Sequence, residues 1–451
     1  MRWLKRIIAL LGVIILILAA VPFFITLDDY IPAIEEEVSA RLREPVKIGS
    51  LRVAGLPLPH LMVRGVTVGA TEDIKVGTVT VTPDLRSLLE TTRVIRSIEI
   101  NGLVLTQNAV DRIPAWIPLE VKAAGSSQPP AVRVEAIKLD DVVLKLEKAT
   151  LGPFDAQLSL TQDGALGIAS IVSRDGTLKA LVKPQHVSYL VEIHAKKWTP
   201  PLGPRIHFDD LVAKGVATLK GASFSDISAQ LYGGVLTGRL VVGWQKGVQV
   251  RGSANVSSVD IAPLLKALDK PENVSGRINA RPDFSAQASS PEQILDALRL
   301  DTPFGIDDGV LHGIDIRKAA TFSSEDGGKG GETRFDRLRG QLSIDRGTRR
   351  LTRLDIASGS LSADGNVTIS PQDQLSGRLN TSIKAASIAA VSVPLNVSGT
   401  LESPLLYPTG GTVAGAVAGT AVLGPGVGTA VGARIGQWFE NLFGKKDEEK
   451  Q

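Results

Sequence analysis

The sequence predicts a mainly β protein: an elongated, twisted antiparallel sheet curled into an apolar groove, with one N-terminal transmembrane helix and a few short helices. Apolar and polar residues alternate from about residue 46 to about residue 400, punctuated by Gly, Asp, Asn and Pro, as in successive strands. Aromatic residues are only 4% of the chain, and β-branched residues typical of strands abound. Because few segments have helical periodicity, the apolar face is expected to be covered by curling of the sheet itself.

The N-terminus predicts the membrane helix. Residues 7–27 carry no charge, and at about 1.5 Å per residue this run can cross a hydrocarbon core of roughly 30 Å. Three basic residues precede it and two aspartates follow, which predicts a cytoplasmic N-terminus and an external body. The alternative is a cleaved signal peptide, but cleavage after Ala19 or Ala20 would put Ile17 or Leu18 where a small residue is preferred. A retained anchor is therefore expected.

The sequence divides into five parts. A juxtamembrane amphipathic helix is expected after the anchor, because apolar residues recur there at steps of three and four. The expected parts are an anchor (1–28), this helix (29–45), the N-terminal part of the β groove (46–250), a C-terminal β region (251–408), and a Gly-rich hairpin with a charged tail (409–451).

Two further helices are expected within the β region. One covers residues 261–268. The other begins with Ser290 as N-cap, has Pro291 at the first helical position and Gln293 three residues after the cap, and runs to about residue 300.

One eight-residue phrase recurs along the chain. It reads IEINGLVL at 98–105, IKLDDVVL at 137–144, IHFDDLVA at 206–213 and FGIDDGVL at 304–311. Asn101-Gly102 stands in the first copy where the others have an aspartate pair, and both pairs tolerate unusual backbone angles. A divalent cation would not accept this exchange, because Gly102 offers no side-chain ligand. The phrase predicts a bulge or tight turn within the sheet.

Catalytic signatures are absent from the sequence. The chain has no cysteine, and its five histidines stand in no zinc-binding or nucleophile motif. Asp301, Asp307, Asp308 and Asp315 could serve acid–base chemistry, but each stands close to Gly or Pro in a turn-like setting. A net charge of +3 does not favour a nucleic-acid partner. We expect no enzyme activity, no metal and no cofactor.

The C-terminal segment differs from the rest of the chain. Glycines recur every fourth residue in two rows, which favours closely approaching helices. A membrane hairpin, a plug on the end of the groove and a disordered tail are all compatible with this pattern. The candidate membrane-tail residues are Gly424, Gly428, Gly432, Gly436, Trp438 and Phe439.

Several segments resemble a known family. In the C-terminal half these are residues 255–284, 290–316, 333–369 and 393–409, and their order makes the match specific. Residues 43–69 and 84–105 are similar to the start of the same family, while residues 110–250 resemble it only in pattern. The chain is thus similar to the AsmA-like family, so that 251–408 would be its AsmA-like C-terminal β region. The resemblance implies an inner-membrane-anchored, extracytoplasmic bacterial protein related to bridge-like lipid-transfer proteins, with no catalytic residues.

The expected function is binding or passive conduction of phospholipid along the groove in outer-membrane biogenesis. The alternative is a periplasmic scaffold or assembly factor for outer-membrane proteins, and a hydrolase of envelope glycans is a distant third. The expected partners are membrane phospholipid, the inner membrane, and an envelope protein or a second copy of the chain. The interior could also be a closed, packed core. The candidate groove residues are Ile98, Ile100, Leu103, Leu105, Leu342, Ile344, Leu354, Ile356, Leu361, Val367 and Ile369.

Overall fold

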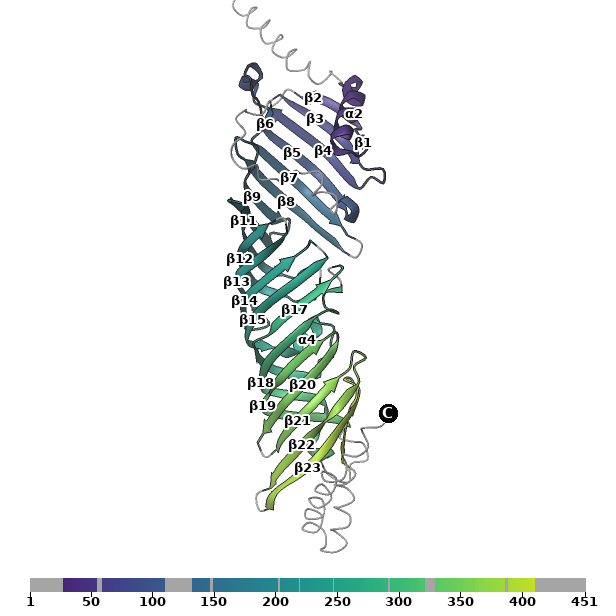
Figure 1. Ribbon diagram of the computed structural model, residues 1–451, viewed down its shortest axis with the longest axis vertical. Helices are drawn as coiled ribbons and strands as arrows, with labels where there is room; N and C mark the ends of the chain where they lie inside the picture. The colour runs from purple at the N-terminus through teal and green to yellow at the C-terminus, as the bar shows by residue number, and fades with distance from the viewer. Residues whose placement is uncertain are drawn as a thin grey trace, which may run out of the picture. The chain divides into compact units, whose positions relative to one another are not determined.

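Strands dominate the part of the chain that the computed structural model describes, which confirms a mainly β protein (Figure 1). The described residues are 27–54, 59–109, 132–146, 149–201, 203–218, 220–245, 247–290, 293–320, 329–359, 361–385 and 388–409. Within them no helix is both long and apolar enough to cross a membrane. The expected anchor (1–28) lies outside the described residues except for Leu27 and Asp28, and the expected Gly-rich hairpin and tail (409–451) lies outside them except for Thr409.

The chain forms two units. Unit 1 consists of residues 1–196 and 213–219, and unit 2 of residues 197–212 and 220–451. Strand β12 (Phe208–Thr218) contributes to both.

Unit 1 is a sheet in which each strand pairs mainly with its neighbours in sequence. Its strands are β1 (Val46–Lys47), β2 (Ser50–Ala54), β3 (His60–Val68), β4 (Ile74–Pro83), β5 (Arg93–Thr106), β6 (Val132–Val134), β7 (Ala136–Lys145), β8 (Thr150–Leu160), β9 (Leu166–Ser173), β10 (Leu178–Gln185) and β11 (Ser188–Trp198). The described pairings are antiparallel except at β5, which is parallel to β6 and β7. The expectation of an antiparallel sheet throughout is therefore wrong at this point.

Unit 2 contains an antiparallel ladder. Its strands are β13 (Gly221–Leu231), β14 (Gly234–Gly243), β15 (Val248–Asp260), β16 (Val274–Ala280), β17 (Asp283–Ala288), β18 (Arg299–Ile314), β19 (Lys329–Asp345), β20 (Thr348–Ser358), β21 (Leu361–Ile369), β22 (Leu375–Ala385), β23 (Ile388–Gly399) and β24 (Pro404–Pro408). The short strands β16 and β17 both pair with β15 on one side and with β18 on the other.

The short helices agree with two of the three expectations. The juxtamembrane stripe forms η1 (Asp28–Tyr30) and α2 (Ile31–Leu42), and α4 (Ile261–Ala267) is the second expected helix. The helix expected from residue 290 to about 300 is wrong in its extent: among the described residues Gln293 is in a 3-10 turn, residues 294–297 form turns, and β18 begins at Arg299. Leu300 pairs there with Phe284 and Ile344, so strand pairing on both sides outweighs the local capping signal. Two more short helices are η2 (Leu85–Leu89) and α5 (Ile316–Ala319).

The recurring phrase marks a crease across unit 1. Gly102 in β5 and Asp141 in β7 have positive φ, 70° and 62°. Gly65 of β3 also has positive φ at the same level, and Gly152 of β8 has positive φ about two residues further along β7. A left-handed residue interrupts the alternation of a strand and re-aims the following side chains. Ile100 and Leu103, which are three positions apart on either side of Asn101-Gly102, therefore lie on one face of the sheet.

The turn interpretation of the phrase is confirmed in three of its four copies. The second residue of the central pair has positive φ in the copies of β5, β7 and β18, where Asp308 is at 52°. It is wrong for residues 206–213, because neither Asp209 nor Asp210 has a positive φ. No group of acidic and histidine side chains in the described residues could hold a metal ion.

Asparagine and aspartate side chains cap the irregular positions. The backbone N–H of Asp141 donates to Asp155 Oδ1 at 3.0 Å, that of Ser258 to Asn279 Oδ1 at 2.9 Å, and that of Arg353 to Asn366 Oδ1 at 2.9 Å. Each donor residue has positive φ, and each acceptor lies on an adjacent strand. The polar residues of these segments thus have a structural role, because they satisfy amides that the strand ladder does not pair.

We expect Asn366→Ala to lower the free energy of unfolding of unit 2 by about 0.5 to 1.5 kcal/mol, because the hydrogen bond that the Arg353 amide donates to Asn366 is lost. Urea denaturation followed by far-UV circular dichroism would measure this loss of stability. The matched control is Asn380→Ala, which removes an exposed side chain whose Nδ2 donates to Asp364 at 3.3 Å and should cost less than about 0.5 kcal/mol. Equal effects of the two changes would show that the cap contributes nothing.

Helix α2 and the preceding turn lie along the first edge of the unit 1 sheet, which β1 and β2 form (Figure 1). Side chains of this segment accept hydrogen bonds from edge amides. The bonds are Val46 N to Ser39 Oγ at 2.9 Å, Ile48 N to Glu35 Oε1 at 2.6 Å, and Leu51 N to Asp28 Oδ1 at 3.1 Å. This edge is therefore protected against pairing with a further strand.

Candidate functional site

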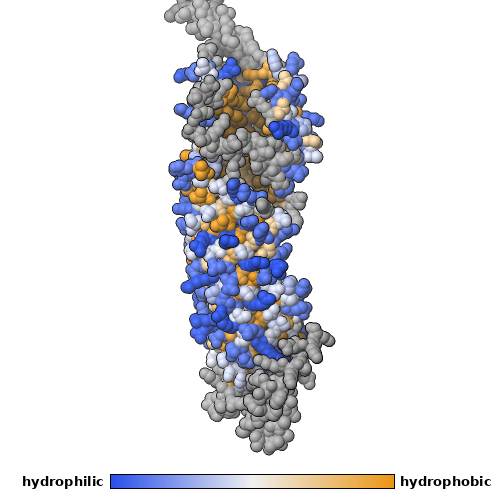
Figure 2. All heavy atoms as spheres, in the orientation of Figure 1, coloured by the Kyte–Doolittle hydropathy of each residue, from blue (hydrophilic) through white to orange (hydrophobic). Residues whose placement is uncertain are grey.

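Unit 1 presents a continuous apolar face. Residues in register on neighbouring strands form apolar rows, for example Val63, Val79, Ile100 and Leu139. The side chains of these rows are mostly half-buried rather than enclosed, so the face remains partly accessible to solvent. Figure 2 shows apolar side chains gathered in a hollow over the upper strands, with polar side chains along its margins.

Four candidate residues lie in the middle of this face, on β5. Ile98 lies between Val81 of β4 and Ile137 of β7. Ile100 lies in the next row, and Leu103 and Leu105 continue the face on the other side of the crease. The first three are half-buried, whereas Leu105 is only 8% exposed. The structure thus brings together four residues from β5 with partners on β3, β4 and β7 that the sequence analysis had not singled out.

The opposite face of these strands is polar and ion-paired. Glu99 and Asn101 alternate with the two isoleucines of β5 and are exposed. Across the sheet, Lys138 Nζ lies 3.1 Å from Asp140 Oδ2. The hydrogen bond and the charge of Asp140 raise the pKa of Lys138. Unit 1 therefore has one face suited to apolar ligands and one suited to water.

Unit 2 encloses its apolar side chains more fully. Leu354, Ile356, Leu361 and Ile369 are between 3% and 7% exposed. Leu354, Ile356 and Leu361 pack in one cluster with Leu395 and Leu406 of the last strands and Ile316 of α5. Ile369 lines a cavity beside this cluster. The cavity has a volume of about 360 Å³, within the range of roughly 300 to 1,000 Å³ that is usual for ligand sites.

The seven predicted groove residues of unit 2 do not all lie at one site. Leu342, Leu354, Ile356, Val367 and Ile369 line the cavity, and Leu361 belongs to the cluster around it. Ile344 lies apart, beside a shallow depression formed with Phe284 and Leu300. The closed core that the sequence left as an alternative therefore describes much of this region, although a cavity remains within it.

The comparison with known sequences identifies the centre of the chain. The sequence model of the AsmA family matches residues 191–354. The chain is AsmA-like. No curated protein and no solved structure matches it.

The AsmA match extends from β11 into β20. It confirms the resemblance there, and the similar segments nearer both ends remain a resemblance. The match to this family suggests a protein of the bacterial envelope involved in outer-membrane assembly or lipid transport.

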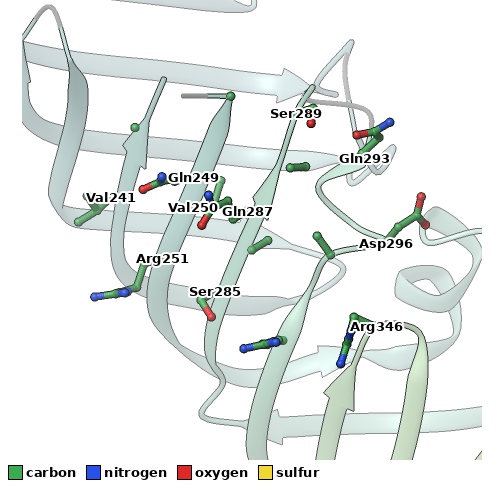
Figure 3. Close-up of a pocket in the computed structure, with 16 residues that line it drawn as sticks. Val241, Gln249, Val250, Arg251, Ser285, Gln287, Ser289, Gln293, Asp296 and Arg346 are labelled. Atoms are coloured by element: carbon green, nitrogen blue, oxygen red, sulfur yellow. The ribbon is translucent and has the colours of Figure 1, made fainter. Parts of the chain in front are cut away.

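A second, larger depression in this AsmA-like chain has a lining of mixed polarity. It lies on unit 2 beside β14, β15 and β17 and has a volume of about 1300 Å³ (Figure 3). Its walls carry exposed Arg251, Asp296 and Arg346, and the Nε of the neighbouring Arg299 lies 3.2 Å from Asp345 Oδ1. Val241 and Val250 line the same depression beside these charged groups, so its lining does not select between polar and apolar ligands.

The aspartates considered for acid–base chemistry have separate structural partners. Asp307 accepts a hydrogen bond from Asn279 at 3.2 Å, and Asp308 pairs with Arg277 at 2.7 Å. Asp315 caps α5 by accepting from the Lys318 amide at 2.9 Å, and Asp301 accepts from Gln341. Their side chains do not converge on one point among the described contacts.

Local partners, rather than a shared site, also displace the carboxyl pKa values of unit 1. Hydrogen bonds from Ser173 and Thr177 lower the pKa of Asp175, and a hydrogen bond from His194 lowers that of Glu192. Both carboxyl groups lie on turns or on the polar side of strands. The apolar faces are thus the most distinctive candidate sites in the described part of this AsmA-like chain.

Proposed function

We propose that the protein is anchored in the inner membrane and binds phospholipid in the periplasm through acyl chains held on the apolar face of unit 1. Lipid would move along this face passively, as part of outer-membrane biogenesis and without a catalytic step. The observation that carries the proposal is the row of half-buried Val, Ile and Leu side chains that crosses β3, β4, β5 and β7. The AsmA match supports the envelope setting.

The energetics favour this role. Each methylene moved from water to an apolar surface gains about 0.8 kcal/mol, so a chain lying along several apolar rows would be held without any specific polar contact. The polar margins and the ion-paired reverse face would leave the headgroup in water. Because neighbouring rows are alike, displacement from one row to the next changes the energy little, which suits passive movement.

The proposed location follows from the N-terminal residues. The uncharged run 7–27, with basic residues before it and aspartates after it, would hold the N-terminus in the cytoplasm and the β units in the periplasm. At the far end, lipid would pass to an envelope protein or a second copy of the chain.

Strand addition at the N-terminal edge is disfavoured. A scaffold that binds outer-membrane proteins by its strand edges would need free backbone amides. The side chains of Asp28, Glu35 and Ser39 already accept hydrogen bonds at this edge. This favours lipid binding over the scaffold function for unit 1.

A photo-crosslinking residue at position 100 is expected to capture phospholipid in cells, whereas one at position 99 is not. Ile100 belongs to the half-buried apolar face, and the adjacent Glu99 is exposed on the opposite face. Mass spectrometry of the crosslinked protein would identify the lipid.

The two positions are a matched pair, because they are neighbours on one strand and differ in the face that they occupy. Equal capture at both would show that contact with lipid reflects mere proximity to the bilayer. Capture of protein alone at position 100 would favour the scaffold function.

A further inference from the structure

Glycines align across the unit 1 sheet at the crease. They are Gly49, Gly65, Gly77 and Gly102, which follow one another from the segment before β2 through β3, β4 and β5. A Cβ added to Gly65 would lie 3.7 Å from the Cα of Gly49, and one added to Gly102 would lie 3.7 Å from the Cα of Gly77. Asp141 of β7 takes the next place in the row. The crease is therefore a line along which four neighbouring strand segments have no side chain.

Backbone angle and close approach explain why these positions are glycine. Gly65 and Gly102 have positive φ, 66° and 70°, which residues with a side chain disfavour. Gly49 and Gly77 do not have positive φ, but a Cβ there would come within 3.0 Å and 3.1 Å of a backbone oxygen of the adjacent strand. The bare line is thus a consequence of how the strands bend at the crease.

The crease divides the apolar face of unit 1 into two lanes. The first lane consists of the rows Leu61, Val81, Ile98, Ile137 and Val63, Val79, Ile100, Leu139, and the second lane consists of the rows Val66, Val76, Leu103 and Val68, Ile74, Leu105, Leu144. All residues of the first lane are half-buried, and so is the row of the second lane that borders the crease. A ligand can therefore reach apolar side chains on both sides of the crease.

An acyl chain is held better on a lane than on the crease. The side chains of a lane remove methylene groups from water. The crease instead presents peptide groups, and Gly49, Gly65 and Gly77 are exposed; contact of methylene groups with such polar groups brings no comparable gain. On β5 the two border residues, Ile100 and Leu103, are three positions apart, which is about 10 Å at the usual rise of a strand. Two acyl chains can thus lie side by side, one on each side of the crease.

We propose that a diacyl lipid straddles the crease with one acyl chain in each lane, so that unit 1 selects lipids with two chains over lipids with one. This inference rests on the proposed lipid-binding function and concerns how the same face holds its ligand. Each chain is removed from water by its own lane. A single-chain lipid occupies one lane and leaves the other in water.

The first test blocks one lane and measures capture in the other. Full-length protein in nanodiscs of phosphatidylethanolamine and phosphatidylglycerol carries a photo-crosslinking residue at position 103, and Ile100→Arg blocks the first lane. Isotopically labelled diacyl phosphatidylethanolamine and its lyso form are supplied in equal amounts. Capture of the diacyl lipid should fall at least about tenfold, because its other chain would stay in water, whereas capture of the lyso form should be unchanged. The reciprocal pair, Leu103→Arg with the crosslinker at position 100, should give the same result.

The second test needs no substitution, so it holds even where an arginine variant does not fold. A diacyl phosphatidylethanolamine with a diazirine on each acyl chain is bound to the wild-type protein, and doubly crosslinked residues are located by mass spectrometry. One lipid molecule should join the two lanes, for example Val79 to Leu103. A matched lipid with both diazirines on one chain should join residues of a single lane, for example Val79 to Ile100.

The inference is overturned if the lipid with a diazirine on each chain joins residues of one lane only. It is also overturned if Ile100→Arg lowers capture of the diacyl and lyso lipids equally, or lowers neither. These outcomes leave the proposed function in place, because that function requires only capture of lipid at position 100 and not at position 99. Absence of lipid capture at both positions 100 and 103 in the wild type would overturn the proposed function together with the inference.

Discussion

Replacing Ile356 by arginine is expected to unfold much of unit 2. The side chain is 3% exposed and packs in the main apolar cluster, beside Leu338 on β19 and Ala363 on β21. A guanidinium there would have neither a partner nor water, and we expect a loss of about 4 kcal/mol or more in the free energy of unfolding. Limited proteolysis should then cut within β19 to β22, and urea denaturation should show a lowered midpoint.

The control for this change is Asp355→Ala. Asp355 is the neighbouring residue on β20 and is exposed on the opposite face. Its replacement should alter stability by less than about 0.5 kcal/mol. If the arginine variant at position 356 resisted protease as well as the wild type, the interior around it would be open to water and unit 2 would be a channel rather than a core.

The direction of the apolar side chains could be predicted from the sequence. The period of two correctly places Leu354 and Ile356 on one face of β20, and it places Ile98 and Ile100 together on β5. What it cannot supply is whether anything covers that face. In unit 2 the covering side chains come from β23, β24 and α5, more than thirty residues away along the chain. Coverage is thus a tertiary property, which explains why similar patterns give a half-exposed face in one unit and a core in the other.

Local sequence patterns also could not predict the parallel pairing of β5 with β7. Neighbouring strands pair antiparallel through short turns, whereas parallel strands need a long crossover connection. The chain between Thr106 and Val132 is long enough for such a crossover connection, and this length was the sequence feature that could have predicted the parallel pairing.

The helix predicted at residues 290–300 shows the opposite error. There a good cap was read as a helix, although Leu300 pairs on both sides as a strand residue.

The aspartate pairs show how much of the backbone conformation can be predicted from turn-forming residues. The exchange of Asn-Gly for Asp-Asp correctly predicted irregular backbone in three copies. It could not show that the irregular residues of β3, β5 and β7 align into one crease, because alignment depends on strand register. Nor could it show that Asp155, Asn279 and Asn366 serve as caps, since donor and acceptor are on different strands.

The replacement of Ile100 by arginine is expected to abolish lipid capture by unit 1 while the protein remains folded. Ile100 is half-buried in the open apolar face, so the long side chain can extend its charged end toward water. We expect a stability loss of only about 1 kcal/mol. A charge among the apolar rows would repel acyl chains, and capture by a photo-crosslinker at the nearby Leu103 should fall at least tenfold.

Glu99→Arg provides the matched control, because it introduces the same side chain one residue away on the exposed polar face. It should leave capture at position 103 unchanged. The contrast with Ile356 is the decisive comparison: the same substitution on an open face removes binding and spares the fold, while in the covered unit it removes the fold. If Ile100→Arg instead unfolded unit 1, its apolar face would be a packed interface, and acyl chains would have no access to it. A folded variant with undiminished capture would show that lipid does not travel over β5.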